Sequence, residues 1–311
     1  MRELTAYDRE VIEELRARDE FFWLDLDTPD AATLEALADQ LNWHPLAVED
    51  TREWNQRAKL DDYDDHVLLV FYGVRPASEP QDALPLEVHL YVHGGYVVTI
   101  HRGCSELGHI RQRAQRRQPE SEQLLVYMIL DGLTDTFFPV LEAVDNEIDV
   151  LETEITLDAQ HHQVDRMFRL KRHLLSLRRV VGPMRDIFST QLDILEELPG
   201  LQKGSRDYFR DVWDHLTRIA EQIDSYRDIL SSAMDVYLSS VSNRVNDVMK
   251  QLTTIATIFL PLSFVVGFFG QNFGWLVLHI DTPLAFWGLG IGSLVVSCAI
   301  LLGWFRRRGW L

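Results

Sequence analysis

Short apolar runs separated by polar turns characterise the first 120 residues of the chain. These runs are rich in β-branched and aromatic residues, which favour strands, and Gly, Pro or Asp separates them. Gly94 and Gly95 indicate a two-residue hairpin between the last two runs. We therefore expect residues 1–120 to form a compact α/β domain with a mixed sheet and helices around it. The runs predicted to be strands cover residues 21–26, 66–74, 87–94 and 96–102.

One helix of this domain is predicted by a capping pattern at its N-terminus. The segment TPDAATLEALADQL, residues 28–41, has apolar positions at helical spacing. Thr28 is suited to be the N-cap, because its hydroxyl can accept a hydrogen bond from the first turn. Pro29 then occupies the first helical position, where its missing N–H group costs nothing.

After residue 120 the apolar positions recur at spacings of three and four, as on amphipathic helices. Residues 121–204 contain two such segments, 121–155 and 164–198, each with a Gly or Pro expected to kink the helix without ending it. From Ser205 to Leu260 there is neither Gly nor Pro, which predicts a helix of roughly 84 Å. Its apolar stripe needs a partner along its whole length. The stripe consists of Phe209, Val212, Leu216, Ile219, Ile223, Tyr226, Leu230, Ala233, Tyr237, Val241, Val245, Val248 and Leu252.

Two long uncharged runs lie in the last third of the chain. We expect a stalk at 205–250, a first span at 251–273, a loop at 274–282, a second span at 283–305 and a basic tail at 306–311. Each run is long enough, at about 1.5 Å per residue, to cross a hydrocarbon core of roughly 30 Å. A buried core helix is the alternative. Two such runs in close succession favour transmembrane helices.

Basic residues predict the orientation of these spans. Arg244 and Lys250 precede the first span, and three arginines follow the second in the tail 306–311. The loop 274–282 contains neither Lys nor Arg. By the positive-inside rule, both termini are expected to be cytoplasmic. The residues that follow Met1 are polar, so no cleaved signal peptide is expected, and the protein is predicted to be a multi-pass protein of the cell (inner) membrane.

The chain is strongly acidic, with 48 Asp and Glu against 30 Lys and Arg and a formal net charge of −18. Such a charge disfavours nucleic acid as a partner and favours cations. Solubility alone explains the overall charge equally well. Cys104 and Cys298, the latter inside a predicted span, provide no disulfide framework.

Two amides, Gln271 and Asn272, lie between Gly270 and Gly274 at the predicted outer end of the first span. A permeating species would meet these amides first. Two spans in one chain have no interior between them, so several copies would have to surround an axis. One face of the span mixes small, polar and apolar residues, which fits a pore lining and close helix packing equally well. The residues of this face are Asn246, Met249, Thr253, Ala256, Leu260, Ser263 and Gly267.

Five segments, in this order along the chain, strongly resemble the CorA family of divalent cation channels. They are HPLAVED, NQRAKLDDYDDH, DNEIDVLETEI, the stalk and first span from YRDILSSAMDVYLSS to FVVGFFGQNFGW, and the terminal FRRRGWL. The resemblance covers essentially the whole chain. It implies a homopentameric funnel in which α+β cytoplasmic domains precede long stalk helices and two C-terminal transmembrane helices. First spans form an inner ring, and second spans an outer ring.

The family's usual Gly-Met-Asn motif is Gly270-Gln271-Asn272 in this chain. The resemblance implies that Asn272 presents a ring of amide oxygens to an incoming ion. Such acceptors suit hydrated Mg²⁺, the leading candidate, because this ion sheds water reluctantly. Gln271 adds a second amide, which leaves Zn²⁺, Co²⁺, Ni²⁺ or a less selective cation channel as alternatives. Asp281 is the only acid in the following loop, fewer than many family members carry.

Matching positions imply further roles along the axis. Asn246 and Met249 lie near the cytoplasmic end, and Leu252 and Leu260 form apolar constrictions that can gate by dewetting. Ser263 and Gly267 follow above them. Asp235 would form an acidic ring at the inner entrance, and an ordinary solvated stalk residue is the alternative.

The resemblance also implies closure by intracellular Mg²⁺ bound between cytoplasmic domains. Asp211 matches a stalk carboxylate of the family, and His215 lies one turn later on the same face. Glu79 and Asp82 are candidate partners from the neighbouring domain, although neither falls at the matching position.

Two other classes of protein are less consistent with the sequence. A membrane-anchored scaffold would use the stripe and the spans but would not need an amide pair between glycines. An enzyme would need a nucleophile or a metal cluster in the soluble part, where we find neither a nucleotide loop nor a nucleophile elbow. Single histidines are expected to be structural or surface residues there: His44, His66, His89, His93 and His101.

Overall fold

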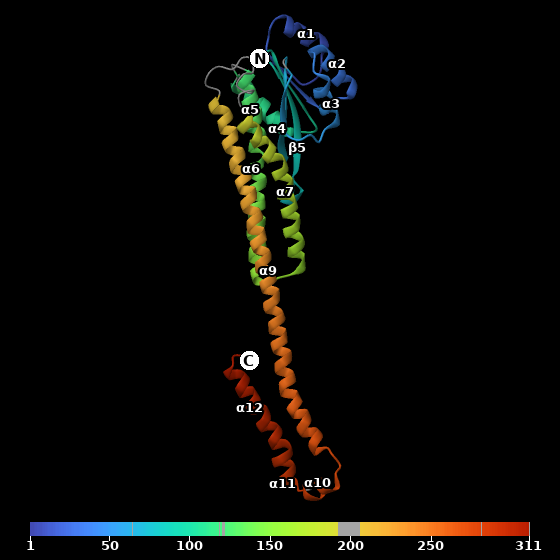
Figure 1. The fold of residues 1–311 in the computed structure, drawn as a ribbon, viewed down its shortest axis with the longest axis vertical. Coiled ribbons are helices and arrows are strands. Elements are labelled where there is room, and N and C mark those ends of the chain that lie inside the picture. Colours follow the sequence, from blue (N-terminus) through green and yellow to red (C-terminus); the bar gives the residue numbers. More distant parts are fainter. Residues whose placement is uncertain (64, 118, 120–121, 192–205, 281, 311) are drawn as a thin grey trace. The chain divides into compact units, whose positions relative to one another are not determined.

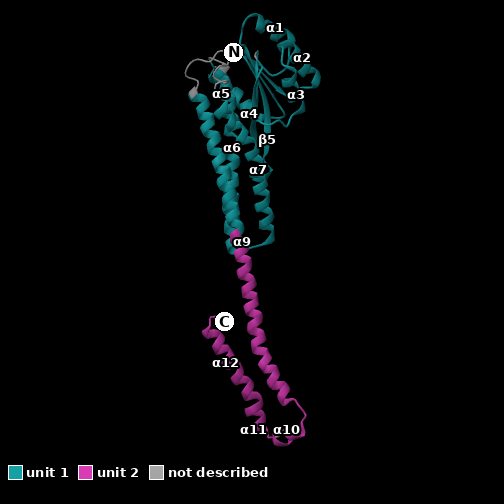
Figure 2. Cartoon of the chain, in the orientation of Figure 1, with its two compact units in different colours: residues 1–234 teal, residues 235–311 magenta. Residues whose placement is uncertain are grey.

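The structure is a computed structural model that describes residues 1–63, 65–117, 119, 122–191, 206–280 and 282–310. Two compact units, Met1–Met234 and Asp235–Leu311, make up the chain (Figure 2). The boundary between them falls inside one long helix, whereas the sequence suggested segment boundaries at 120, 204 and 250. Residues 204, 205 and 281, on which some of the predictions rest, lie outside the described residues.

Unit 1 is built on a mixed six-stranded sheet with the order β1-β2-β6-β5-β4-β3. β1, β2 and β6 are parallel to one another, and β6, β5, β4 and β3 are antiparallel. The pairing of His93 with Tyr96 confirms the predicted hairpin between β5 and β6. The strands are β1 (Arg2–Leu4), β2 (Phe22–Asp27), β3 (Lys59–Asp62), β4 (Val67–Arg75), β5 (Leu84–His93) and β6 (Tyr96–His101).

Helices cover both faces of this sheet (Figure 1). The helices before β4 are α1 (Arg9–Ala17), α2 (Ala31–Leu41) and α3 (Pro45–Glu53), and the short 3₁₀ helix η1 (Pro80–Asp82) joins β4 to β5. α3 packs on one face, where Thr51 hydrogen-bonds the side chains of His89 and Tyr91 on β5. On the other face, Phe188 of the helical region contacts Phe71 of β4 edge to face.

The predicted N-cap of α2 is wrong by two residues. Asp30, not Thr28, has the extended backbone of an N-cap, and its carboxylate accepts a hydrogen bond of 2.7 Å from Thr33 N. Thr28 instead has a φ of +50°, and its backbone N–H donates to His101 O of β6 at 2.7 Å. Because the backbone of Thr28 is bonded to the sheet, the helix begins later, after Asp30.

The helical region consists of α4 (Ser105–Arg117), α5 (Glu122–Asp135), α6 (Phe137–Leu157) and α7 (His161–Thr190). The segment 121–155, expected to be one helix kinked at a Gly or Pro, is instead divided at Thr136: α5 ends at Asp135 and α6 begins at Phe137, although the backbone of Thr136 stays helical. Its hydroxyl accepts a hydrogen bond of 2.8 Å from Val74 N and so ties the junction to β4. α7 continues through Pro183, as predicted.

The helix α9 (Arg206–Phe269) continues without interruption from unit 1 into unit 2 and contains Pro261. Its apolar stripe has two different environments. Within unit 1 the stripe is buried, with exposures of 0–3% at Phe209, Val212, Leu216, Ile219, Ile223, Leu230 and Ala233. Within unit 2 its later members are exposed, at 56% for Val245, 56% for Val248 and 60% for Leu252.

Unit 2 continues with α10 (Gly274–His279), α11 (Pro283–Ala285), the π-helical segment η2 (Phe286–Gly292) and α12 (Ser293–Arg307). The segment expected as a loop, 274–282, therefore contains a short helix. Among the described residues, three helical stretches are long and apolar enough to cross a membrane. Gln123–Leu157 is mostly buried in unit 1, whereas Asp207–Phe269 and Pro283–Arg307 leave nearly all of their most apolar windows exposed. Only these last two stretches therefore still need an apolar environment.

Candidate functional site

The amide pair lies where α9 ends. The helix stops at Phe269, and the chain turns away through hydrogen bonds from Gly270 N to Val266 O (2.9 Å) and from Gln271 N to Phe268 O (3.3 Å). A Cβ at position 270 would approach Val266 O to 3.1 Å, which explains a glycine at this tight turn.

The side chains of Gln271 and Asn272 are exposed and make no hydrogen bond to any residue that the structure describes. Each amide carries one acceptor oxygen and two N–H donors. Unit 2 therefore presents two amides, free to bind solvent or an ion, directly after the uncharged last stretch of α9, residues 251–269.

The residues expected along the axis all lie on α9 and are all exposed in the single chain. At Gly267 an added Cβ would meet no atom within 4 Å, so nothing inside the chain requires a glycine there. Asp235, at the start of unit 2, is also exposed. The expected axial residues are Asn246, Met249, Leu252, Leu260, Ser263 and Gly267.

A cluster of titratable side chains joins α5 to α9 in unit 1. Asp131, Asp135 and His215 each place one ligand atom within 4.8 Å of the others. The Nδ1 atom of His215 lies 3.8 Å from Asp131 Oδ1, and Nε2 lies 3.8 Å from Asp211 Oδ1. Nδ1 is buried and has no hydrogen-bond partner. At 3.8 Å, the nitrogens of His215 are too far from the two carboxylates for hydrogen bonds, although they face them.

Asp131 is the buried member of this cluster, with an exposure of 7%. Burial, with a further contribution from Asp135, raises the pKa of Asp131, and the positive charge of Arg113 opposes this shift. Arg113 approaches only to 3.6 Å, so it neutralises the carboxylate incompletely. A divalent cation would therefore stabilise the ionised form of Asp131.

Asp211 occupies the rim of the same cluster, half-exposed on α9. It accepts a hydrogen bond of 3.1 Å from the hydroxyl of Tyr127 on α5. Burial, with the charges of Asp131 and Asp211, raises the pKa of Tyr127 to about 12, so the phenol remains a neutral donor. The structure thus brings the predicted pair Asp211 and His215 together with two aspartates that the sequence analysis missed.

Two carboxylates and one imidazole form a donor set that suits divalent cations. Imidazole nitrogen favours Co²⁺, Ni²⁺ and Zn²⁺, whereas Mg²⁺ prefers oxygen and retains water. Asp131, Asp135 and His215 could therefore hold a transition metal directly, or Mg²⁺ through its bound water.

Glu79 and Asp82 lie at a different place in unit 1. Both are exposed: Glu79 precedes η1 and Asp82 is its last residue, and η1 packs against α6 and α7. Within the described part of the chain, neither forms a hydrogen bond or an ion pair with Asp211 or His215. The structure of one chain therefore does not join the four candidate regulatory residues into a single site.

Hydrogen bonds give structural roles to most of the single histidines. His44 caps α3 by accepting from Leu46 N at 3.2 Å. His89 is buried between Thr51 and Glu87, and His101 lies 3.2 Å from Asp25 and accepts from Cys104 N at 3.0 Å. His93 stacks on Tyr96, and His66 is buried beside Tyr63 and Tyr91. Burial raises the pKa of Cys104 to about 11, so the thiol next to His101 is not an activated nucleophile.

These features together define a protein with an α/β unit and two long, exposed apolar helices of the kind that cross a membrane. The family model described as CorA-like Mg²⁺ transporter protein matches residues 18–307. The chain belongs to this family, whose members are transporters, so the expectation that it is not an enzyme is confirmed.

Individual relatives agree with this assignment. The cobalt/magnesium transport protein CorA of Thermotoga maritima is 34% identical over 278 residues, which cover 86% of this chain and 77% of the relative. The divalent cation transporter CmaX of Pseudomonas aeruginosa is 26% identical over 301 residues, which cover 94% and 88% of the two chains. The structure of full-length CmaX matches with a TM-score of 0.72, over 92% of this chain and 87% of that one.

The CorA magnesium transporter structure from Methanocaldococcus jannaschii shares the fold, with a TM-score of 0.79 and 22% sequence identity. The match covers 93% of this chain and 91% of that one. The predicted fold class, an α+β domain followed by long helices and two C-terminal spans, is therefore confirmed.

Proposed function

We propose that this protein is a channel for the passive influx of divalent cations, with Mg²⁺ as its principal ion. The observation that carries the proposal is the pair of free amides, Gln271 and Asn272, at the end of the exposed, uncharged last stretch of α9. Family membership supports it, and the relatives from Thermotoga maritima and Pseudomonas aeruginosa are named for cobalt/magnesium and divalent cation transport. The basic residues around the spans support cytoplasmic termini and an outer position for the amides.

Conduction requires several copies of the chain, and we infer a homopentamer as in the CorA funnel. The exposed half of the α9 stripe supports this inference, because Val245, Val248 and Leu252 lack a partner in their own unit. Five copies around an axis would cover these residues and would enclose a path lined by α9. Lipid would cover the outward surface of α12.

At the mouth, five copies of Asn272 would present a ring of amide oxygens to a hydrated ion. Neutral oxygens can accept hydrogen bonds from the water bound to Mg²⁺ without removing that water. Leu252 and Leu260 would form apolar rings that conduct only when wide enough to stay wet. Asp235 would concentrate cations at the inner entrance.

We infer that intracellular divalent cations close the channel by binding to the cytoplasmic unit. The cluster of Asp131, Asp135, Asp211 and His215 supports this inference, because burial disfavours the charge of Asp131 and the Nδ1 atom of His215 has no hydrogen-bond partner. Glu79 and Asp82 of a neighbouring subunit are candidates to complete the site. An ion held there would stabilise the closed arrangement by its higher affinity for that arrangement.

Gln271 favours one alternative: a transporter for Zn²⁺ or another transition metal, or a less selective cation channel. An amide at this position replaces an apolar thioether and can contact hydrated ions or orient Asn272. The imidazole of His215 also suits Co²⁺, Ni²⁺ or Zn²⁺ better than Mg²⁺.

Flux into liposomes through two mouth variants tests the proposal. Asn272→Ala should reduce Mg²⁺ flux by at least about tenfold, because the oxygen ring disappears. Gln271→Met should retain conduction and shift the preference towards Mg²⁺ in competition with Zn²⁺, Co²⁺, Ni²⁺ and Na⁺.

Val296→Ala, a change in the middle of the second span and outside the mouth residues, serves as the control variant for reconstitution. Undiminished flux in Asn272→Ala would contradict the role of Asn272. An unchanged ion ranking in Gln271→Met would limit Gln271 to packing.

A further inference from the structure

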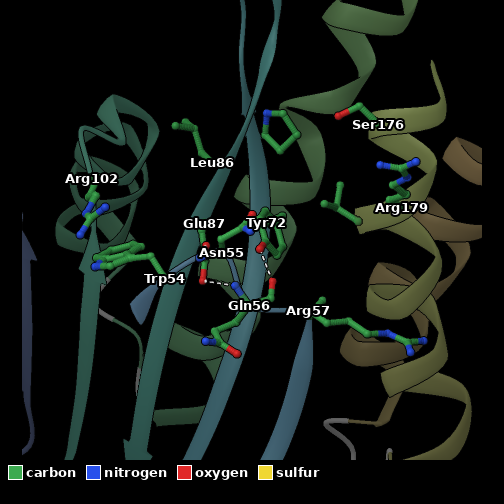
Figure 3. Close-up of a pocket in the computed structure, with 13 residues that line it drawn as sticks. Trp54, Asn55, Gln56, Arg57, Tyr72, Leu86, Glu87, Arg102, Ser176 and Arg179 are labelled. Atoms are coloured by element: carbon green, nitrogen blue, oxygen red, sulfur yellow. Dashed lines mark hydrogen bonds between the residues drawn. The ribbon is translucent and has the colours of Figure 1, made fainter. Parts of the chain in front are cut away.

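A pocket of about 660 Å³ opens in unit 1 between β5, the connection from α3 to β3, and α7. Figure 3 shows Trp54 and Arg102 on one side of this pocket and Arg57, Ser176 and Arg179 on the other. A volume of several hundred Å³ is typical of sites for small organic ligands. No residue of this pocket belongs to the proposed ion path or to the Asp131 cluster.

The floor of the pocket is a braced segment of unusual backbone conformation. Trp54 and Asn55 both have a φ of +57°, in the left-handed region that non-glycine residues rarely adopt. The carboxylate of Glu87 accepts hydrogen bonds from Asn55 N at 2.6 Å and Gln56 N at 3.0 Å. Tyr72 donates to Gln56 O from the adjacent strand. These bonds fix the segment that begins the NQRAKL motif, which the proposed transport function does not use.

The pocket is lined mainly by basic residues, whereas the chain as a whole is acidic. The lining holds three arginines, Arg57, Arg102 and Arg179, and one acid, Glu87. Glu87 already accepts hydrogen bonds from two backbone N–H groups and lies 2.8 Å from His89 Nε2. None of the three arginines forms an ion pair with an acid among the described residues. In a chain with 48 acids and 30 basic residues, three such arginines in one pocket form a local site for anions.

We propose that this pocket binds a polyphosphate anion, such as the triphosphate chain of a nucleotide. Guanidinium groups bind phosphate oxygens through paired N–H donors and remain charged at any physiological pH. The arginines lie on both sides of the pocket in Figure 3, which suits an extended anion with several charges better than a single small one. Arg102 is held with its guanidinium 4.3 Å from the ring centre of Trp54, so that side of the site is already ordered.

Isothermal titration calorimetry on the full-length protein in detergent, with a chelator present, tests this proposal. ATP and inorganic tripolyphosphate are the two probes. The double variant Arg57→Gln, Arg179→Gln should weaken the binding of both by at least about tenfold, the effect of losing about 1.4 kcal/mol of binding free energy. Arg52→Gln is the matched control, because Arg52 is exposed on α3 and pairs with Glu35 outside the pocket.

Equal affinities for the two probes would assign recognition to the polyphosphate, and tighter binding of ATP would add the nucleoside. Either result supports the site if the double variant loses binding and the control does not. Absence of saturable binding by both probes would overturn the proposal. So would equal affinities in the wild type and the double variant. This test is independent of ion transport, so it can fail while the proposed function stands.

Discussion

Asp131 shows at the scale of a single residue how folding can create the charge environment of the proposed cation site. Helix α5 carries this carboxylate into the interior beside Asp135, and burial raises its pKa. Folding therefore favours the protonated form. The free energy of unfolding therefore falls as the pH rises from the ordinary carboxyl pKa to the raised pKa of Asp131. Above the raised pKa the loss is complete, because Asp131 is then ionised in both states. A bound divalent cation reverses the balance.

Asp131→Asn should therefore have opposite effects with and without metal. In a chelator at neutral pH, the variant should melt a few degrees higher than the wild type, because the cost of the buried charge is gone. Added Mg²⁺ or Co²⁺ should raise the melting temperature of the wild type and raise that of the variant much less. The wild-type response should also shrink as the pH falls and Asp131 becomes protonated.

Asp214→Asn is the matched control for the thermal melts, because Asp214 is exposed on α9 beside the cluster but outside it. Its response to metal should equal that of the wild type. An unchanged metal response in Asp131→Asn would exclude this cluster as a cation site.

Asp211→Asn should weaken the closure of the channel by internal Mg²⁺ while leaving the maximal flux unchanged. The reason is position: Asp211 lies 3.8 Å from His215 and accepts a hydrogen bond from Tyr127, far along the chain from the residues of the mouth. The measurement is the dependence of flux on internal Mg²⁺. An unchanged dose response would place the sensor elsewhere, for example at Glu79, Asp82 or the acids of α6.

Sequence spacing predicted only part of the cluster. Asp211 and His215 are four residues apart, so their shared face follows from helix geometry. Asp131 lies about 80 residues earlier, and only the packing of α5 on α9 shows that the two helices share a site. The one available signal was an acid in the otherwise apolar run LLVYMILDGL.

At the scale of an element, α9 carries one stripe in two environments. Tertiary packing buries the stripe as far as Ala233, and from Val245 onwards the valines are more than half exposed. Burying one such side chain contributes roughly 1.5–3 kcal/mol. The exposed half of the stripe is therefore the strongest physical reason to expect contacts between copies of this helix.

Val245→Asp should weaken or abolish the homopentamer, because it would bury like charges between copies of α9. Native mass spectrometry of the wild type in mild detergent should show five subunits, and the variant should show smaller species. Asn243→Asp places the same charge on the opposite face of the helix and should leave the pentamer intact. A stable wild-type monomer or dimer would contradict the pentamer, and an unaffected variant would remove the stripe from the interface.

The elements themselves were largely predictable. The strands β2, β4, β5 and β6 follow from dense β-branched and aromatic runs, and α9 follows from a long stretch free of Gly and Pro. β1 and β3 were missed because three or four mostly polar residues give no period, and only pairing with β2 and β4 makes them strands. The cap at Asp30 was missed because Thr28 is engaged by β6.

At the scale of the whole molecule, an α/β unit and two exposed apolar helices belong to one chain of the CorA-like Mg²⁺ transporter family. The net charge of −18 favours cations near the protein, and the amides at the end of α9 offer neutral oxygens where charge is absent. In the proposed function, regulation and permeation would use different chemistry: carboxylates and imidazole in unit 1, and amides in unit 2.

The most direct test of transport is Mg²⁺ uptake into liposomes that contain the purified wild-type protein. With an inward Mg²⁺ gradient and little internal Mg²⁺, the protein should produce uptake well above that of empty liposomes. Uptake should need no added energy source and should stop as internal Mg²⁺ rises. If pentameric protein in sealed liposomes gave no Mg²⁺ uptake above the empty control, the account of this chain as an Mg²⁺ channel would be contradicted.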